Sequence, residues 1–214
     1  MSIFGEIIST YDVEQAAVKT LREWTNDYLA EIERKRGLPK KTIPRPPAFE
    51  SYHGGVDLES WTQDVAPEVM VICKPLGAPE IRGQGGYGQG YDLTVGCLWV
   101  GTGSALAERP EDEARAVASY LGAASMLLVQ QPTLGALSER LRMTAPPTIS
   151  LPNPDRRDIA LATTQFEVWV ATIIEEGEGP LALGQEPEEP YPEGPEVETT
   201  SETVKAEPVT EAIH

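Results

Sequence analysis

Four groups of residues in this chain have types and spacing that could carry chemistry. The first is glycine-rich: Gly83, Gly85 and Gly88 match the G-x-G-x-x-G pattern of dinucleotide-binding loops. That pattern works where it ends a strand and opens a helix, because the helix N-terminus then holds the pyrophosphate. Here a strand-like run follows. The segment therefore favours a hairpin-like connection, with Tyr87 at a tip that suits contact with a partner.

The second and third groups are a histidine and an acidic triplet. His53 has no G-x-S-x-G, paired Cys/His or metal-ligand spacing around it, whereas a catalytic histidine needs a nucleophile or carboxylate beside it. Glu111, Asp112 and Glu113 open a predicted helix, where they complement the helix dipole and diverge around the axis. The sequence therefore predicts no catalytic residue, no metal and no cofactor, and we expect the chain not to be an enzyme.

The fourth group consists of arginines that could cluster near one sheet edge. They have two interpretations: a charged edge that prevents aggregation, or a docking surface for an acidic neighbour. Aromatic residues in predicted loops add to the candidates for contacts between protein chains. The full set of interaction candidates is Tyr52, Trp61, Arg82, Tyr87, Arg140, Arg142, Arg156 and Arg157.

Two helices are predicted to frame these candidates. Residues 10–36 form the first, with Asp12 as its N-cap, Gln15 completing a capping box and Gly37 as its stop. Its apolar face is predicted to comprise Val13, Ala17, Leu21, Trp24, Tyr28 and Ile32. The second helix begins at Pro110 and ends before Pro132. A stripe of small residues would let it pack closely on a sheet: Ala114, Ala118, Gly122 and Ser125.

Four strands are predicted between and after the helices. Residues 68–74 lie between two prolines, and residues 91–101 alternate apolar and polar side chains. Residues 139–151 are interrupted by Pro146 and Pro147, which indicates an edge strand or a bulge. Residues 159–174 are predicted to form a long strand in which Phe166, Val168, Val170 and Ile174 share one face. The fold class is therefore α+β (mixed α/β): one mainly antiparallel four-stranded sheet with two main helices packed on it.

The charge of this 214-residue chain divides it into two parts. Residues 177–214 hold ten glutamates and one lysine, a net charge of −9 out of −17 in total. With few large apolar side chains, this segment is predicted to be an acidic low-complexity tail without a fold of its own. Residues 1–176 are predicted to form one domain with a long proline-rich loop at 38–66, which begins as an extended basic arm over residues 38–47. The acidic surface of this domain argues against specific binding of nucleic acid.

Composition also sets the expected compartment. The chain has no apolar run of about 18 residues, so no membrane span is expected, and its N-terminus lacks the regions of a secretory signal. Cys73 and Cys97 lie in apolar, strand-like runs and are interpreted as buried thiols in a reducing compartment. Where it is ordered, the acidic tail is expected to lie on basic residues of an adjacent chain, in the 38–47 segment or among the four arginines.

The order of these elements resembles the tail terminator proteins of long-tailed phages with non-contractile tails, especially those of actinobacterial phages. The resemblance covers roughly residues 10–176 and consists of an order of elements, not a catalytic signature. The loop 38–66 and the tail 177–214 depart from the family pattern. The segments that carry the resemblance are the helix through RKRGLP, then APEVMVICKP, RGQGGYGQGYD, LTVGCLWV, RPEDEARAVASYLGAASMLLVQQPTLGAL and DRRDIALATTQFEVWVATI.

The resemblance implies a structural virion protein of the tail and neck, assembled in the host cytoplasm. Such proteins form a ring, usually of six copies, on the head-proximal end of the tail tube and stop its polymerisation. The implied partners are other copies of the chain, the major tail-tube protein and a head-completion or neck protein, while DNA passes through the lumen without specific binding. The alternatives are another head–tail joining protein (a stopper or adaptor), a nucleotide-binding domain using loop 83–90, and a generic interaction module with an acidic tail.

Overall fold

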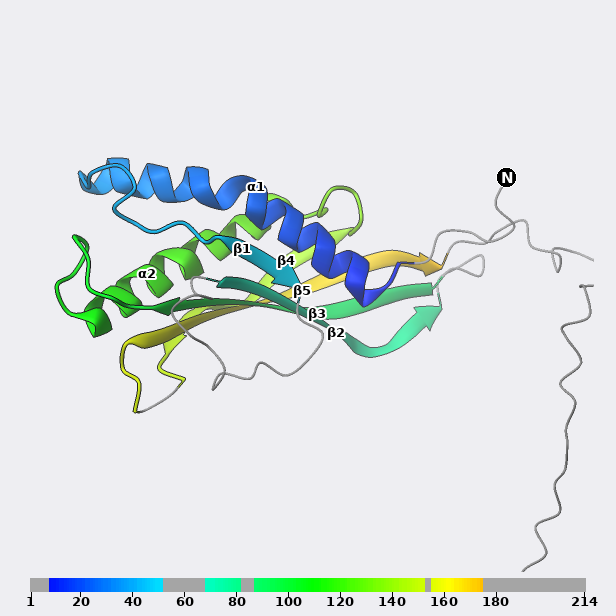
Figure 1. The fold of residues 1–214 in the computed structure, drawn as a ribbon. Coiled ribbons are helices and arrows are strands. Elements are labelled where there is room, and N and C mark those ends of the chain that lie inside the picture. Colours follow the sequence, from blue (N-terminus) through cyan, green and yellow to red (C-terminus); the bar gives the residue numbers. More distant parts are fainter. Residues whose placement is uncertain (1–7, 52–67, 82–86, 153–154, 175–214) are drawn as a thin grey trace, which may run out of the picture.

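A computed structural model describes residues 8–51, 68–81, 87–152 and 155–174 of the chain. The five strands form one sheet in the order β1-β2-β3-β5-β4. Figure 1 shows both α-helices on the same face of this sheet. In chain order the elements are α1 (Thr10–Arg36), β1 (Ala48–Ser51), β2 (Glu68–Ile81), β3 (Tyr87–Val100), α2 (Pro110–Ser125), the 3-10 helix η3 (Met126–Gln130), β4 (Arg140–Ser150) and β5 (Ile159–Ile174).

The α+β class is confirmed, but the predicted four-stranded sheet is wrong by one strand. The four predicted strands are present and pair with antiparallel neighbours. The additional strand is β1, which pairs parallel to β2 with Ala48 opposite Glu68 and makes the sheet mixed. This strand has four residues and follows Pro46 and Pro47 directly, so it is too short to show the alternation by which strands are recognised.

The main core lies between the helices and one face of the sheet. Alternate residues of β5, among them Phe166 and Val168, are fully buried on this face, as the predicted strand 159–174 requires. The predicted small-residue stripe of α2 is buried as well. A Cβ added to Gly122 would lie 2.9 Å from the Cβ of Ala162 and 3.1 Å from that of Pro147. Only glycine therefore permits α2 to approach β5 and β4 this closely.

The start of α1 differs from the prediction. Ser9, not Asp12, is the N-cap, and the backbone N–H of Ser9 donates to Oδ2 of Asp12 at 2.7 Å in a reciprocal capping box. The Gln15 side chain, predicted to close the box, instead donates to Oγ of Ser51 in β1 at 2.8 Å. The C-terminal stop at Gly37 is confirmed by its left-handed φ of 66°.

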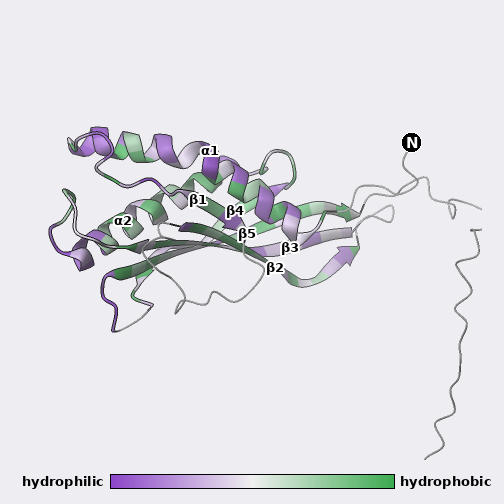
Figure 2. Ribbon diagram, in the orientation of Figure 1, coloured by the Kyte–Doolittle hydropathy of each residue, from purple (hydrophilic) through white to green (hydrophobic). Residues whose placement is uncertain are grey.

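The buried face of α1 is also rotated from the prediction in its second half. Val13, Ala17 and Leu21 are buried as expected. Beyond them the buried residues are Thr25 and Leu29, whereas Trp24 is 44% exposed. Figure 2 shows the resulting bands of hydrophobic and hydrophilic residues along this amphipathic helix. The large aromatic side chain suggested the wrong stripe because apolar character alone does not fix the rotation of a helix on its sheet.

The proline-rich segment after α1 is anchored to the helix by one buried carboxylate. Glu33, which is 2% exposed, accepts hydrogen bonds from the backbone N–H of Lys41 at 3.0 Å and of Ile43 at 2.8 Å. Nη2 of Arg45 forms an ion pair with the same carboxylate at 2.9 Å. Residues 38–47 are therefore not an extended arm, as predicted, but a connection held against α1. The rest of the predicted loop, residues 52–66, lies outside the described residues.

Substitution of Glu33 tests this anchor. The hydrogen bonds from Arg45 lower the pKa of Glu33 to about 2, helped by those from the backbone of Ile43 and Lys41 and opposed by burial. Glu33→Gln removes the charge that these donors stabilise, and we expect it to lower the free energy of unfolding at neutral pH by about 2–4 kcal/mol in chemical denaturation.

The control is Glu31→Gln, which removes an exposed carboxylate paired with Arg34 on the same helix and should leave stability nearly unchanged. The stabilisation from Glu33 is fully present above its ordinary pKa of 4.5 and is lost as the pH falls toward 2. The difference between the wild type and Glu33→Gln must therefore shrink over that interval. A difference that is absent at neutral pH, or matched by Glu31→Gln, would contradict the anchor.

Candidate interaction surface

The distal half of β2 leaves the core, whereas the part of β3 that pairs with it stays in the sheet between β2 and β5. We call Pro75–Ile81 of β2 together with Tyr87–Gly90 of β3 the hairpin arm. Every residue of β2 from Lys74 to Ile81 is exposed, whereas Glu68–Val71 at its start are buried. Figure 1 shows this end of β2 curving away beyond the helices. The strand was predicted to end at residue 74, whereas β2 continues to Ile81.

A wide bulge gives the hairpin arm its curvature. Leu76 pairs with Gly90 and Glu80 pairs with Gly88, so three residues of β2 face the single residue Gln89 of β3. Gly77 has a φ of 70° within this bulge, a conformation that glycine adopts without strain. The buried Gln89 side chain donates to the carbonyl oxygen of Leu76 at 3.1 Å and so ties the bulged strand to β3.

The hairpin arm exposes three large apolar side chains. Leu76 is 47%, Ile81 is 77% and Tyr87 is 39% exposed. Ile81 and Tyr87 are direct cross-strand partners, so they form one continuous patch. Single exposed apolar residues are ordinary, but several on one projecting hairpin indicate a surface that another protein covers. Tyr87 is exposed, as the sequence analysis expected, but it lies in β3 opposite Ile81 and not at the tip of the connection.

The backbone edges of the sheet are closed to strand addition at specific points. After β1 ends, the next outward N–H of β2, that of Cys73, donates to the buried carboxylate of Glu14 at 2.8 Å. Two residues further along, Pro75 has no N–H to offer, and on the opposite edge Pro146 and Pro147 interrupt β4 as predicted. Contacts of the hairpin arm with a partner must therefore be made chiefly by side chains.

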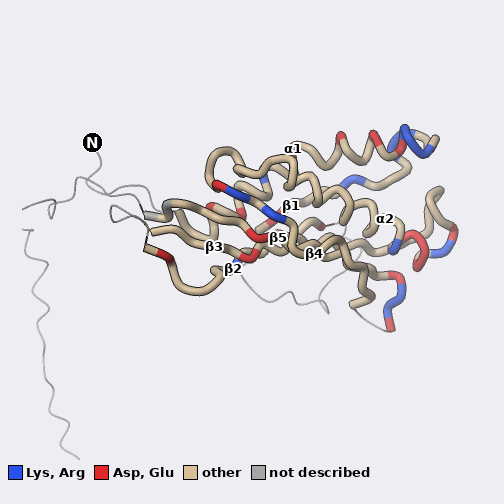
Figure 3. Tube along the Cα trace, turned by 180° about the vertical axis from the view of Figure 1, so that it is seen from behind, with Lys and Arg blue, Asp and Glu red and all other residues tan. Residues whose placement is uncertain are grey.

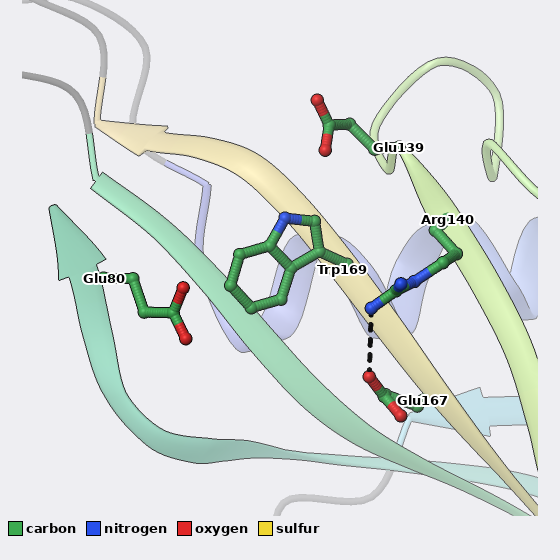
Figure 4. A pocket seen from close by; sticks show the side chains of 5 residues that line it. All are labelled: Glu80, Glu139, Arg140, Glu167 and Trp169. Carbon is green, nitrogen blue, oxygen red and sulfur yellow. Dashed lines mark hydrogen bonds and ion pairs between the residues drawn. The ribbon is translucent and has the colours of Figure 1, made fainter. Parts of the chain in front are cut away.

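Beside the hairpin arm, on the sheet face opposite the helices, lies an open hollow of about 770 Å³. It is lined by Glu80, Glu139, Arg140, Glu167 and Trp169. Figure 4 shows the Glu80 carboxylate and the Trp169 indole on opposite sides of this hollow, with Arg140 bonded to Glu167 at 3.3 Å. The indole lies over β3, because a Cβ at Gly90 would be 3.3 Å from the ring. The lining of the hollow therefore combines the aromatic surface of Trp169 with three carboxylates and one arginine.

The four arginines singled out from the sequence fall into two groups. Arg140 and Arg142 both pair with Glu167, while Arg156 pairs with Asp158 at 2.8 Å and Arg157 is exposed on the turn before β5. The two groups lie at opposite ends of β4, on the order of 30 Å apart at about 3.3 Å per residue. They do not form one docking surface, and three of them are neutralised by carboxylates.

Three of the predicted interaction candidates lie outside the described residues: Tyr52, Trp61 and Arg82.

The sequence analysis missed three residues of this surface: Leu76, Ile81 and Trp169. For Leu76 and Ile81, the prolines and glycines around them indicated a turn-rich connection where the structure has a bulged strand. For Trp169, the alternation of β5 was correctly assigned, and it placed this side chain on the face opposite the core without indicating a surface.

Two buried thiols and one buried carboxyl group in the described part of the chain have raised pKa values. Burial raises the pKa of the Cys73 thiol and of the Cys97 thiol to about 12, so both thiols stay protonated and unreactive at neutral pH. Burial, followed by the charge of Glu50, raises the pKa of Glu68. Across the described ranges no group of three or more His, Cys, Asp or Glu side chains could hold a metal ion. Within the same ranges no helix is long and apolar enough to cross a membrane.

Comparison with known proteins does not identify a family for this chain. No protein-family model matches the chain, and no curated protein matches it.

Removing the exposed aromatic residue of the hairpin arm tests its role. Tyr87 contributes little to the core, whereas tyrosine is a frequent anchor in interfaces. We expect Tyr87→Ala to leave the Tm nearly unchanged and to weaken self-association, measured by sedimentation velocity over a concentration series. Ile81→Asp should have the same effect more strongly.

The matched control is Trp24→Ala, which removes an aromatic residue of similar exposure from α1. This variant should associate as the wild type does. A large loss of Tm in Tyr87→Ala would show that Tyr87 belongs to the core, and unchanged association of both arm variants would remove the hairpin arm from the interface.

Proposed function

We propose that this chain is a structural virion protein: a tail terminator that assembles as a ring on the head-proximal end of a phage tail tube. In this role it ends tube polymerisation and joins the tail to the neck of the filled head. Its partners are further copies of itself, the tail-tube protein and a neck protein. The protein is assembled in the host cytoplasm and acts in the virion, and it needs no catalytic residue or cofactor.

The observation that carries this proposal is the hairpin arm. Its apolar residues Leu76, Ile81 and Tyr87 are exposed at the end of the sheet where β2 curves away from the core. Burying such side chains favours association, because apolar surface leaves water. A ring requires a contact between two different surfaces that closes by rotation, and a projecting arm that reaches onto the next copy is suited to such a contact.

The layering of the domain also supports an assembly role. Both helices cover one face of the sheet, which leaves the hollow around Trp169 on the other face (Figures 1 and 4). An aromatic residue flanked by charged groups is a common composition for the centre of an interface. The acidic balance of residues 1–176, with 24 acids and 16 bases, suits a ring whose lumen must pass DNA without binding it.

The order of elements supports the family resemblance, and the structure bears on one alternative. Gly88, the last glycine of the G-x-G-x-x-G match, lies within β3, and the strand continues to Val100. No helix N-terminus follows the glycines to hold a pyrophosphate. Another head–tail joining protein, a stopper or an adaptor, remains the alternative within the same class of structural proteins.

The proposal is tested with tubes polymerised from the tail-tube protein of the same phage. We expect added wild-type protein to cap one end of each tube as a ring in negative-stain images and to stop further growth. Ile81→Asp should cap fewer tubes at the same concentration, and Val129→Asp, which places the same charge at an exposed apolar residue of η3, should cap as the wild type does.

Binding to filled heads but not to tubes would show a stopper or adaptor instead. Protein that stays monomeric and binds neither heads nor tubes would contradict the proposal as a whole.

A further inference from the structure

The C-terminal end of α1 is a cationic region in an acidic protein. Residues 27–45 contain six basic and three acidic residues, a net charge of +3, while the whole chain has a net charge of −17. Figure 3 shows the basic residues gathered where α1 ends. Because opposite charges attract and the rest of the chain is acidic, this region is a preferred place for an acidic segment to bind.

Part of this positive charge has no carboxylate partner. Arg45 pairs with Glu33, and Arg34 pairs with Glu31, which Lys35 also approaches. Arg36 donates to the Tyr120 hydroxyl at 3.0 Å. Among the described residues, no carboxylate lies within ion-pair distance of Arg36, Lys40 or Lys41, and Asp27 is the one carboxylate of the region without a cation partner. The charged residues of this region that lack an ion-pair partner are therefore three cations and one carboxylate.

Lys40, Lys41 and Asp27 line a groove, which distinguishes the region from a flat charged surface. A hollow of about 650 Å³ lies between α1 and the segment 38–45. We call this hollow the basic groove. Ala30 and Leu38 give it an apolar part, and its charged lining has four cations against three carboxylates: Arg34, Lys40, Lys41 and Arg45 against Asp27, Glu31 and Glu33. A site of this shape and composition fits an acidic stretch of protein chain that also carries occasional apolar residues.

The two groups of arginines singled out from the sequence offer no comparable site. Around the hollow beside the hairpin arm, Arg140 and Arg142 are outnumbered by Glu80, Glu139 and Glu167. On the turn before β5, two arginines are balanced by Asp155 and Asp158. The local net charges are thus −1 and 0, against +1 for the lining of the basic groove. Of the surfaces that the sequence left open, the basic groove alone has a net positive lining among the described residues.

We propose that the basic groove is the binding site for the chain's own acidic segment, residues 177–214. That segment has a net charge of −9 and carries Leu181, Leu183 and Tyr191 among its glutamates and prolines. Charge complementarity comes from Lys40 and Lys41, and the apolar contact comes from Ala30 and Leu38. This inference does not depend on the proposed function.

The geometry permits binding within one chain. The end of β5 lies beside the start of α1, since the Ile8 N–H donates to the Ile173 carbonyl at 2.8 Å. The basic groove lies at the other end of α1, about 40 Å away for a helix of this length at 1.5 Å per residue. A flexible chain the length of residues 175–214 has an end-to-end distance of roughly 35 Å and spans more than about 100 Å when extended.

Binding within one chain is also favoured energetically over binding between free chains. Exposed ion pairs are individually weak and screened by salt. A tethered segment, however, experiences an effective concentration in the millimolar range, far above that of a second chain in dilute solution. The segment should therefore occupy the groove of its own chain at low ionic strength and leave it as salt is added.

Paramagnetic relaxation enhancement measures this contact in the full-length chain. A spin label on Ser201→Cys reacts selectively, because Cys73 and Cys97 are buried. In about 0.05 M salt we expect loss of amide signal intensity at residues 36–43, and recovery at roughly 0.5 M salt, where charges are screened within a few ångströms. The double variant Lys40→Glu/Lys41→Glu should abolish the loss. Lys19→Glu/Arg115→Glu, with the same charge change at exposed sites elsewhere, should preserve it.

A mixture of isotope-labelled chains without the spin label and unlabelled chains with it separates the two modes of binding. We expect no signal loss in this mixture. Signal loss at residues 36–43 in the mixture, comparable to that in the spin-labelled chain itself, would assign the segment to a second copy and overturn binding within one chain. No loss at residues 36–43, or loss that survives charge reversal in the groove, would overturn the basic groove as the site.

Discussion

The buried carboxylate of Glu33 is the constraint on which the arrangement of this domain depends. By accepting the N–H groups of Lys41 and Ile43 and pairing with Arg45, it turns the chain back along α1 and delivers β1 to the edge of β2. Two other buried glutamates act in the same way. Glu14 takes the N–H of Cys73, and Glu113 takes the N–H groups of Thr102 and Gly103. Each of these carboxylates is placed by a helix and accepts hydrogen bonds from backbone N–H groups outside that helix.

This pattern explains what could and could not be predicted from the sequence. Alternation in β5 and the small-residue stripe of α2 are local properties, and both predictions are confirmed. Glu33 has helical spacing like any surface residue, so its burial depends on contacts eight to twelve positions away that no local pattern records. The anchored segment 38–47 was missed for that reason, and the fifth strand, β1, was missed because four residues are too few to show an alternation. The distal half of β2 was missed because it is rich in proline and glycine. These residues form a bulge within the strand here, but they are also typical of turns.

The closed edges and the open hairpin arm together define how the protein can meet others. Glu14, Pro75 and the prolines of β4 leave few places for an incoming strand, which limits uncontrolled edge-to-edge aggregation. The exposed side chains of Ile81 and Tyr87 then carry the contact by shape and apolar surface. The basic groove lies at the other end of α1 from the hairpin arm, so the proposed self-association and the proposed binding of the acidic segment use different surfaces.

Hydrogen exchange on the free and the assembled protein tests the central claim, that the hairpin arm is the assembly interface. The account predicts that amides of β2 from Leu76 to Ile81 exchange rapidly in the free chain and slow markedly on assembly, because a partner covers them. Amides of the turn at residues 155–158 should change little and serve as the internal reference. Slowed exchange at that turn, with the hairpin arm still exchanging as in the free chain, would contradict the account.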